Sequence, residues 1–228
     1  MTRIDVVRAA LAATGGQQRY LEIGVKDGAC FHAVDAPTKV GVDPAFAFRL
    51  ALGARLRAAL GRRSGTLYFE ETSDSFFARR AARLAPFDVV FVDGLHTYGQ
   101  AYRDVVSSLE HLADGGVVLV HDSNPASAAA AAPTLEQAAR TEGFVGQWNG
   151  DVYRAIVRLR TRDDLRVDVL DCDQGIGLVR RGVPDVRVRL SEAEIEKLTF
   201  DDLARDRPGL LGLRPPSDLG ALLPASRT

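Results

Sequence analysis

Acidic and histidine side chains stand where two apolar runs of this sequence end. One run is followed by Asp93 and His96, and a later run is followed by His121 and Asp122. If the two runs are neighbouring parallel strands, they end at the same edge of a sheet, and the carboxylates of Asp93 and Asp122 can converge on one point. Two carboxylates in a partly dry cleft repel each other, and a divalent cation removes that repulsion. Such ligands favour Mg²⁺, with Mn²⁺ or Ca²⁺ as alternatives.

A glycine turn follows the first apolar run. Gly24 and Gly28 permit a tight turn and the close approach of a ligand to the backbone. Asp43, at the end of the next run and about 20 residues further on, is placed to accept hydrogen bonds from the two hydroxyls of a ribose. Because Lys26 replaces a glycine of the dinucleotide-binding fingerprint, an adenosyl ligand without phosphates fits better. The alternative for Asp43 is a turn that it starts with Pro44.

These side chains need a sheet that brings the ends of several strands together. Short apolar runs alternate with helical periodicity, which predicts an α/β fold. We expect a Rossmann-like, doubly wound, mostly parallel seven-stranded sheet with helices on both faces and a C-terminal antiparallel hairpin. The expected strands are 19–25, 39–43, 66–71, 87–93, 117–122, 164–171 and 175–182, and the expected helices are 4–14, 48–60, 74–85, 101–112, 134–141, 150–162 and 191–198.

The composition is that of an ordinary globular chain. With 228 residues, of which 46% are hydrophobic and 26% charged, it suits one domain over 1–228. A net charge of -1 gives no electrostatic reason for a nucleic acid or an anionic membrane as partner. No apolar run approaches the roughly 20 residues of a membrane span, and no signal-peptide core opens the chain, which predicts a cytoplasmic protein. The N-terminal helix and the apolar segment 210–224 favour a homodimer.

Four motifs in this order carry a family resemblance. They are E-I-G-x-x-x-G at 22–28, V-G-V-D-P at 40–44, F-V-D-G-x-H-x-Y at 91–98 and G-G-x-x-x-x-H-D at 115–122. Together they resemble the class I S-adenosylmethionine-dependent methyltransferases, and within them the macrocin-type, metal-dependent sugar O-methyltransferases. The resemblance covers residues 19–122 well.

The resemblance implies S-adenosylmethionine as the cofactor. Glu22, Gly24 and Gly28 would shape the pocket for its methionine part, and Asp43 would bind its ribose. Ser73 would contact the adenine end, although a helix cap, for which Asp74 is also a candidate, is an alternative role for this residue.

The resemblance also implies how the cation acts. Asp93 and Asp122 would hold a metal that binds a substrate hydroxyl, lowers its pKa and orients its oxygen toward the methyl group. Asp93 would lie beside both the cofactor and the metal and would take part in catalysis. His96 falls where such enzymes carry a Lys or His base, and an imidazole is suited to accept the hydroxyl proton. A hydrogen-bonded structural histidine is the alternative.

The third protein ligand of the metal is open. In the sugar-modifying relatives the fifth strand ends in two acids, whereas here it ends in His121 and Asp122. His121 is favoured as the replacement, while Ser123 and Asn124 are alternatives.

The leading interpretation is therefore a Mg²⁺-dependent O-methyltransferase that acts on a saccharide hydroxyl, for example in the synthesis of methylated mannose polysaccharides or glycosylated natural products. Tyr98, Tyr102 and Trp148 are candidates for the acceptor pocket, each with packing as the alternative. A catechol or phenol O-methyltransferase and a non-catalytic S-adenosylmethionine-binding protein are the competing interpretations.

Overall fold

The computed structural model describes residues 1–15, 18–50 and 65–224. They form two compact units. The N-terminal unit consists mainly of Thr2–Gly94 and Asp104–Leu119, and the C-terminal unit mainly of Leu95–Arg103 and Val120–Leu222. Each unit is described separately below. The single domain expected over the whole chain stays a prediction.

The N-terminal unit is built on a sheet with the strand order β3-β2-β1-β4-β5. Parallel pairing joins β1 to β2 and to β4, with Leu21 opposite Val40 on one side and Val90 on the other. Every residue of β2 and β4 is buried, as strands covered on both faces require. The strands are β1 (Arg19–Ile23), β2 (Thr38–Asp43), β3 (Gly65–Glu70), β4 (Phe87–Val92) and β5 (Leu112–Val120).

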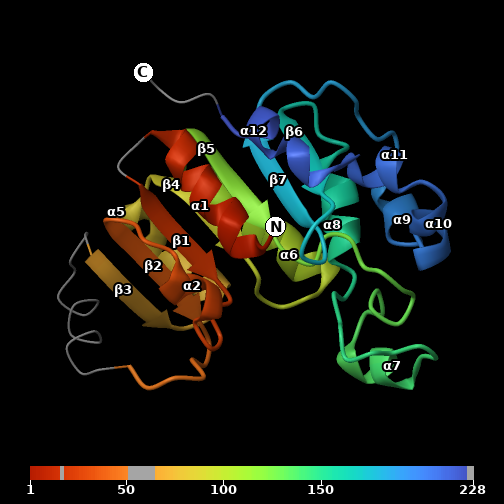
Figure 1. The fold of residues 1–228 in the computed structure, drawn as a ribbon, viewed down its shortest axis with the longest axis horizontal. Coiled ribbons are helices and arrows are strands. Elements are labelled where there is room, and N and C mark those ends of the chain that lie inside the picture. Colours follow the sequence, from red (N-terminus) through yellow and green to blue (C-terminus); the bar gives the residue numbers. More distant parts are fainter. Residues whose placement is uncertain (16–17, 51–64, 225–228) are drawn as a thin grey trace. The chain divides into compact units, whose positions relative to one another are not determined.

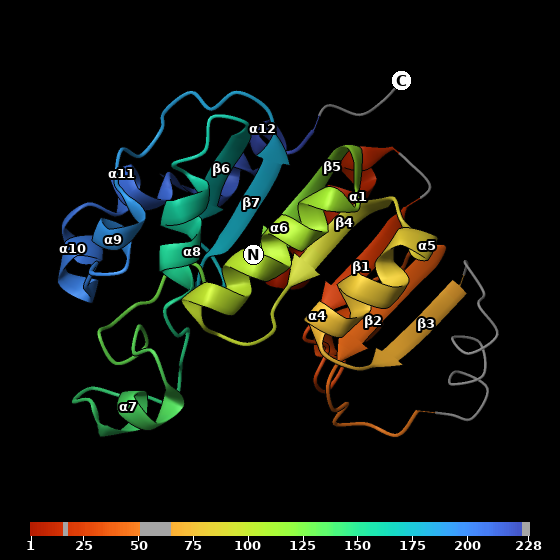
Figure 2. The ribbon, with the colours of Figure 1, turned by 180° about the vertical axis from the view of Figure 1, so that it is seen from behind.

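Helices cover both faces of this sheet, which confirms the doubly wound arrangement. Helix α1 lies on one face, and the continuous helical segment α4, η1 and α5 lies on the other (Figures 1 and 2). Helix α1 starts after a capping box in which Thr2 and Asp5 satisfy each other's backbone N–H groups, and it ends at Gly15 in the left-handed region. The helices are α1 (Arg3–Thr14), α2 (Ala29–Ala33), α4 (Ser73–Phe76), η1 (Phe77–Ala81), α5 (Ala82–Leu84) and α6 (Tyr98–Glu110).

The C-terminal unit contains the predicted hairpin. Strands β6 and β7 pair antiparallel, with Val167 opposite Val179. The two-residue strand β8 adds to β6 in parallel, so the described residues form eight strands and not the expected seven. A strand of two residues is too short to show alternation, which is why the sequence did not predict it. The elements are α7 (Leu135–Arg140), α8 (Val152–Leu159), β6 (Leu165–Leu170), β7 (Ile176–Arg181), α9 (Glu192–Ile195), α10 (Phe200–Arg205), α11 (Arg207–Leu211), β8 (Leu213–Arg214), η2 (Pro216–Asp218) and α12 (Leu219–Leu222).

Three predicted boundaries need correction or fall outside the described chain. Helix α6 starts at Tyr98 and not at residue 101, because the Asp151 carboxylate accepts the Tyr98 backbone N–H at 2.6 Å. Strand β5 starts at Leu112 and runs through the glycines that were expected to precede it. A Cβ on Gly116 would lie 2.8 Å from the Asp88 carbonyl oxygen, so glycine here allows close strand packing. Most of the helix expected at 48–60 lies outside the described residues.

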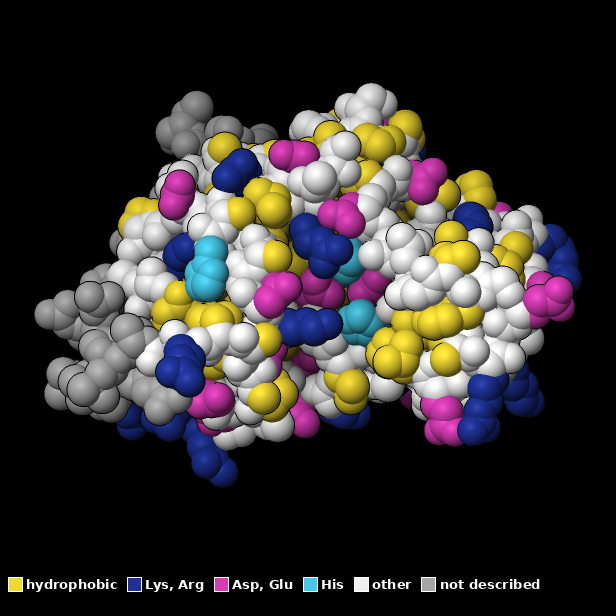
Figure 3. All heavy atoms as spheres, turned by 60° about the horizontal axis from the view of Figure 1, so that its bottom comes forward, with side chains coloured by type: hydrophobic (Ala, Val, Ile, Leu, Met, Phe, Trp, Pro, Cys, Tyr) yellow, Lys and Arg dark blue, Asp and Glu magenta, His cyan; other side chains and the backbone are white. Residues whose placement is uncertain are grey.

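The surface drawn in Figure 3 mixes the two signs of charge. Lys and Arg side chains lie among Asp and Glu side chains over this face. None of the helices in the described part of the chain has the length and apolar character that a membrane crossing requires.

Candidate functional site

The glycine turn after β1 depends on the absence of a side chain at Gly24. This residue has φ +87°, and a Cβ would lie 2.0 Å from the Asp93 carbonyl oxygen and 2.4 Å from its carbonyl carbon. Both obstructing atoms belong to the backbone, so they cannot rotate away. Backbone hydrogen bonds from Gly24 to Val42 and from Asp93 to Ile23 hold the ends of β2, β1 and β4 together at this point. Glycine is thus required where these strands end.

Asp43 ties the end of β2 to the glycine turn. Its two carboxylate oxygens accept the backbone N–H groups of Lys26 and Ala45, each at 2.8 Å, and the residue is buried. The bond to Ala45 forms the turn that is the alternative role of this residue. Each carboxylate oxygen has two lone pairs, so these bonds leave acceptor capacity for the two hydroxyls of a ribose.

Glu22 lies in the core behind the turn. It is 2% exposed, and its carboxylate accepts a hydrogen bond from the Tyr20 hydroxyl. Burial raises the pKa of Glu22 to about 8, the Tyr20 hydrogen bond opposes this rise, and the charge of Asp93 adds to it. The Glu22 carboxyl is therefore largely protonated at pH 7.

The stability of the protein should consequently depend on pH through Glu22. The folded state retains the Glu22 proton up to about pH 8, whereas the unfolded chain loses it near its ordinary value of 4.5. Folding therefore takes up a proton in this range, and the free energy of unfolding falls as pH rises from about 5 to 8, by up to about 1.4 kcal/mol per pH unit. Urea unfolding across this range should show that Glu22→Gln removes this part of the slope. An unchanged slope would contradict the assignment.

The cap of the helix after β3 is Thr72. Its hydroxyl accepts the backbone N–H of Ser75 at 3.3 Å, and Ser73 is the first helical residue. The prediction that Ser73 or Asp74 caps this helix is therefore wrong, because the chain becomes helical one residue earlier than the sequence pattern indicates. The contact of Ser73 with a cofactor stays a prediction.

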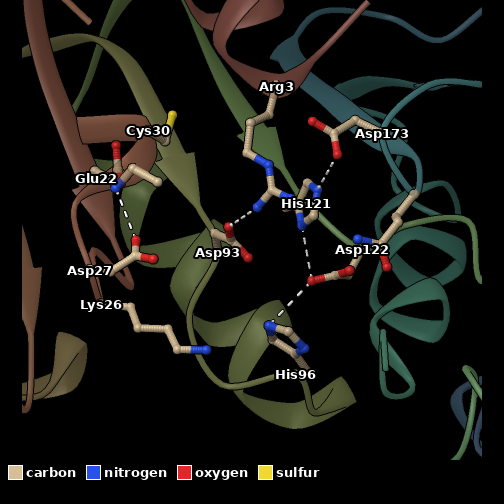
Figure 4. A network of polar contacts seen from close by, with 12 residues as sticks. Arg3, Glu22, Lys26, Asp27, Cys30, Asp93, His96, His121, Asp122 and Asp173 are labelled. Carbon is tan, nitrogen blue, oxygen red and sulfur yellow. Dashed lines mark hydrogen bonds and ion pairs between the residues drawn. The ribbon is translucent and has the colours of Figure 1, made fainter. Parts of the chain in front are cut away.

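Asp93 follows β4 in the N-terminal unit and is bonded by Arg3 of helix α1. The guanidinium Nη1 lies 2.8 Å from the carboxylate Oδ2, and the two side chains are 30% and 16% exposed (Figure 4). The sequence pattern does not indicate this pair, because its members are 90 residues apart.

In the C-terminal unit, Asp122 contacts three polar side chains, of which His96 and His121 are labelled in Figure 4. Its Oδ1 accepts the Asn149 amide N–H at 2.9 Å. Its Oδ2 lies 3.2 Å from Nε2 of His96 and 3.0 Å from Nδ1 of His121. Asp122 is buried and has φ +59°, a backbone conformation that is uncommon for residues other than glycine. The contacts of its carboxylate help to hold the residue in this conformation.

The ring of His96 is held by the segment 148–150. Its Nδ1 lies 3.0 Å from the Trp148 carbonyl oxygen, which can only accept, so Nδ1 carries the proton. The imidazole also packs on the Trp148 ring at 5.1 Å between centroids, and the indole N–H donates to the Ala132 carbonyl at 2.7 Å. A Cβ on Gly150 would lie 1.7 Å from the His96 carbonyl oxygen, so glycine allows this segment to approach His96 closely. Because the proton is on Nδ1 in neutral His96, the lone pair of Nε2 faces the Asp122 carboxylate.

Of the three candidates for the third ligand, His121 is the one placed beside Asp122. The Ser123 hydroxyl donates to the Val120 carbonyl at 2.9 Å. The Asn124 amide donates to Asp171 at 3.1 Å and accepts from Arg207. Both side chains thus have structural partners within their own unit.

Two further residues at this cluster were not predicted as site residues. Asn149 binds Asp122, and Asp173 in the turn of the β6–β7 hairpin lies 3.6 Å from Nε2 of His121 through its Oδ1. Asp173 has φ +43°, and backbone hydrogen bonds from Ser123 and Asn124 to the hairpin turn keep it near His121. An acid in a tight turn is common, so the sequence alone did not mark it.

The two candidate acceptor tyrosines contact Arg158 of α8. Nη1 of Arg158 lies 3.3 Å from the Tyr98 hydroxyl, and the guanidinium lies 4.0 Å from the centroid of the Tyr102 ring. Packing within the C-terminal unit thus accounts for the position of Tyr102.

Comparisons with known proteins agree with the four motifs. Residues 21–123, which are 103 of the 228 residues, match a family model described as a methyltransferase domain. This segment contains the glycine turn, Asp43, Asp93, His96 and Asp122. No curated protein sequence matches the chain.

One solved structure supports the fold. A protein from Corynebacterium glutamicum is 16% identical and has a TM-score of 0.53 over 79% of this chain and 80% of its own. Two others have lower scores. The O-methyltransferase TomG from Streptomyces achromogenes is 18% identical, with a TM-score of 0.45 over 78% of this chain and 77% of its own. The methyltransferase MycE of mycinamycin biosynthesis, in complex with Mg, S-adenosylhomocysteine and mycinamycin VI, is 18% identical, with a TM-score of 0.44 over 74% of this chain and 46% of its own. The chain thus spans about half the length of MycE.

Proposed function

We propose that this protein is a Mg²⁺-dependent O-methyltransferase that moves the methyl group of S-adenosylmethionine to a saccharide hydroxyl, with His96 as the general base. The methyltransferase domain match over residues 21–123 supports the reaction class. The observation that carries the mechanism is the Asp122 carboxylate, which lies within 3.2 Å of a nitrogen of each of two imidazoles.

The N-terminal unit would bind the cofactor. The turn at Gly24 and Gly28 would border the methionine part of the cofactor, and Asp43 offers its remaining lone pairs to a ribose. Glu22 would border the methionine part, and Ser73 would contact the adenine end. Asp93 would lie where the cofactor and the cation meet.

The residues present fit a hard cation. In neutral His96 the Nε2 lone pair is directed at Oδ2 of Asp122, and either a proton on Nε2 or a cation bound nearby removes the repulsion. Asp93, His96 and Asp122 each offer one atom that can ligate a metal. We assign Asp93, Asp122 and His121 to the cation and Nε2 of His96 to the substrate. When bound, Mg²⁺ would polarise the acceptor hydroxyl and make its proton easier to remove.

The side chain of His96 is set up to take that proton at one atom. The Trp148 carbonyl keeps the first proton on Nδ1, so the hydroxyl proton goes to Nε2. The imidazolium that forms is stabilised by the Asp122 carboxylate at 3.2 Å. The acceptor oxygen forms its bond to the methyl carbon as the bond from that carbon to sulfur breaks, and S-adenosylhomocysteine leaves. No covalent enzyme intermediate is needed.

The saccharide acceptor rests on the resemblance of the four motifs to macrocin-type enzymes. Methyl transfer from labelled S-adenosylmethionine to a panel of mono- and oligosaccharides and of catechols, with Mg²⁺ and with EDTA, tests it. Transfer to saccharides that EDTA abolishes is expected. Transfer to catechols alone would replace the substrate class, and cofactor binding without any transfer would favour a non-catalytic protein. A homodimer and a cytoplasmic location stay predictions.

Replacement of His96 tests whether this residue is the general base or a ligand of the metal. His96→Gln should lower kcat by about 10²- to 10⁴-fold, the usual contribution of a general base, and leave Mn²⁺ and cofactor affinity within a few-fold. Turnover and Mn²⁺ binding by electron paramagnetic resonance measure the two effects. His111→Gln is the control, because Nδ1 of His111 bonds the Ser107 carbonyl oxygen four residues earlier, outside the site. If His96→Gln loses Mn²⁺ binding, His96 is a ligand and not the base.

A further inference from the structure

Helix α1 places the positively charged guanidinium of Arg3 beside Asp93. The capping box of Thr2 and Asp5 fixes the start of the helix, which makes Arg3 its first residue. Helix α1 packs on β4, and Asp93 directly follows that strand. The guanidinium of Arg3 is therefore held at the end of β4 by the helix start and by the helix packing.

The resulting pair is short and partly buried. Nη1 of Arg3 lies 2.8 Å from Oδ2 of Asp93, and the Asp93 side chain is only 16% exposed. A charge pair in such surroundings is less screened by salt than a surface pair. Arg3 thus supplies positive charge to the carboxylate that the proposed function assigns to Mg²⁺.

We propose that the Arg3 guanidinium occupies the position at Asp93 that the divalent cation takes when it binds, and that Arg3 thereby sets the affinity of the site for the cation. This inference rests on the proposed function. A divalent ion and a guanidinium seek the same carboxylate and repel each other when both are close. Cation binding must therefore displace Arg3 from Asp93, against the attraction between the guanidinium and the carboxylate. The cost of breaking this pair weakens the binding of the ion.

The pair also has a role before the cation binds. Glu22 lies opposite Phe91 of β4, and Asp93 follows the end of that strand, so two acids lie near the same end of the sheet. Arg3 balances the charge of Asp93 there. Loss of the Arg3 charge should destabilise the cation-free protein, and added cation should restore stability more strongly than in the unmodified protein.

A purely positioning role for Arg3 predicts the opposite change in cation affinity when Arg3 is replaced. If the guanidinium only oriented the Asp93 carboxylate for the metal, removing it would weaken cation binding. Arg3→Lys keeps the charge and loses the planar fork, whereas Arg3→Gln loses the charge, so these two variants separate charge from orientation.

The test is the binding of Mn²⁺ alone, followed by electron paramagnetic resonance at fixed ionic strength. Arg3→Gln should bind Mn²⁺ at least about fivefold more tightly, since the repulsion between a single and a double charge about 5 Å apart exceeds 1 kcal/mol even in water. Arg3→Lys should stay near the unmodified protein. Arg8→Gln is the matched control, because it removes the same charge from the same helix, where Arg8 donates to the Ala33 carbonyl; its affinity should stay within about twofold, as expected for a screened surface charge.

The outcomes distinguish this inference from the proposed function. If the unmodified protein binds Mn²⁺ and Arg3→Gln binds it equally or more weakly, the role of Arg3 is overturned while the metal site stands. If neither protein binds Mn²⁺, the metal site itself is refuted, and the role of Arg3 with it. In the unmodified protein, saturating Mg²⁺ should shift the NMR signals of the Arg3 guanidinium, which are assigned by their absence in Arg3→Lys. Guanidinium signals that Mg²⁺ leaves unchanged would also overturn the inference, even if Arg3→Gln fails to fold.

Discussion

Asp122→Asn should lower the affinity for Mn²⁺ by more than about 100-fold and should abolish methyl transfer. Loss of a hydrogen-bond partner of a metal ligand costs up to about 100-fold in affinity, and the loss of a ligand itself should cost more. The substitution keeps the shape of the side chain, and its amide oxygen can still accept the Asn149 N–H. It removes the negative charge that lies between Nε2 of His96 and Nδ1 of His121. The loss would therefore report on charge and not on packing.

The control for this variant is Asp168→Asn in the same unit. Asp168 pairs with Arg214 on the β6 side of the hairpin, so the variant makes the same change of charge away from the cluster. Mn²⁺ titrations of both variants and of the unmodified protein give the comparison. Equal affinity in Asp122→Asn and the unmodified protein would remove Asp122 from the cation site.

Gly24→Ala should destabilise the protein by about 3 kcal/mol or more, because an alanine in the left-handed region is strained and its Cβ clashes with fixed atoms. That Cβ would lie 2.0 Å from the Asp93 carbonyl oxygen. Relief requires the ends of β1 and β4 to separate, so cofactor binding should be lost as well. The free energy of unfolding in urea and isothermal titration with S-adenosylhomocysteine measure the two effects.

Gly220→Ala provides the contrast. Gly220 lies in α12, and a Cβ added there would meet no atom of the described chain within 4 Å, so alanine should change stability by at most about 1 kcal/mol, in the stabilising direction. If Gly24→Ala were as stable as Gly220→Ala and bound the cofactor normally, the close approach of β1 and β4 would be wrong.

The parallel part of the fold could be predicted because its signals are local. The runs that became β2 and β4 are apolar throughout their centres, and the hairpin of β6 and β7 has a short polar connection. Elements set by distant partners could not be predicted. Helix α6 starts early because Asp151 caps it from 53 residues away, and β8 is a strand only because β6 is beside it.

The candidate site likewise contains residues that the sequence indicated and residues that it did not. Gly24 directly follows β1 and Asp43 is the last residue of β2, so the residue types and their spacing indicated both. The partners that tune the site lie far off in sequence: Arg3 at Asp93, Asn149 at Asp122 and Asp173 at His121. Charged residues on a helix start or in a turn are ordinary surface residues by pattern, and only tertiary structure reveals their contacts.

The most direct test of the account is a crystal structure of the protein with Mn²⁺ and S-adenosylhomocysteine, in which anomalous scattering locates the ion. The account predicts one strong peak bonded to carboxylate oxygens of both Asp93 and Asp122, with Arg3 moved off Asp93 and Nε2 of His96 facing the open side of the ion. Asp93 and Asp122 directed away from each other, with no ion between them at saturating Mn²⁺, would contradict it.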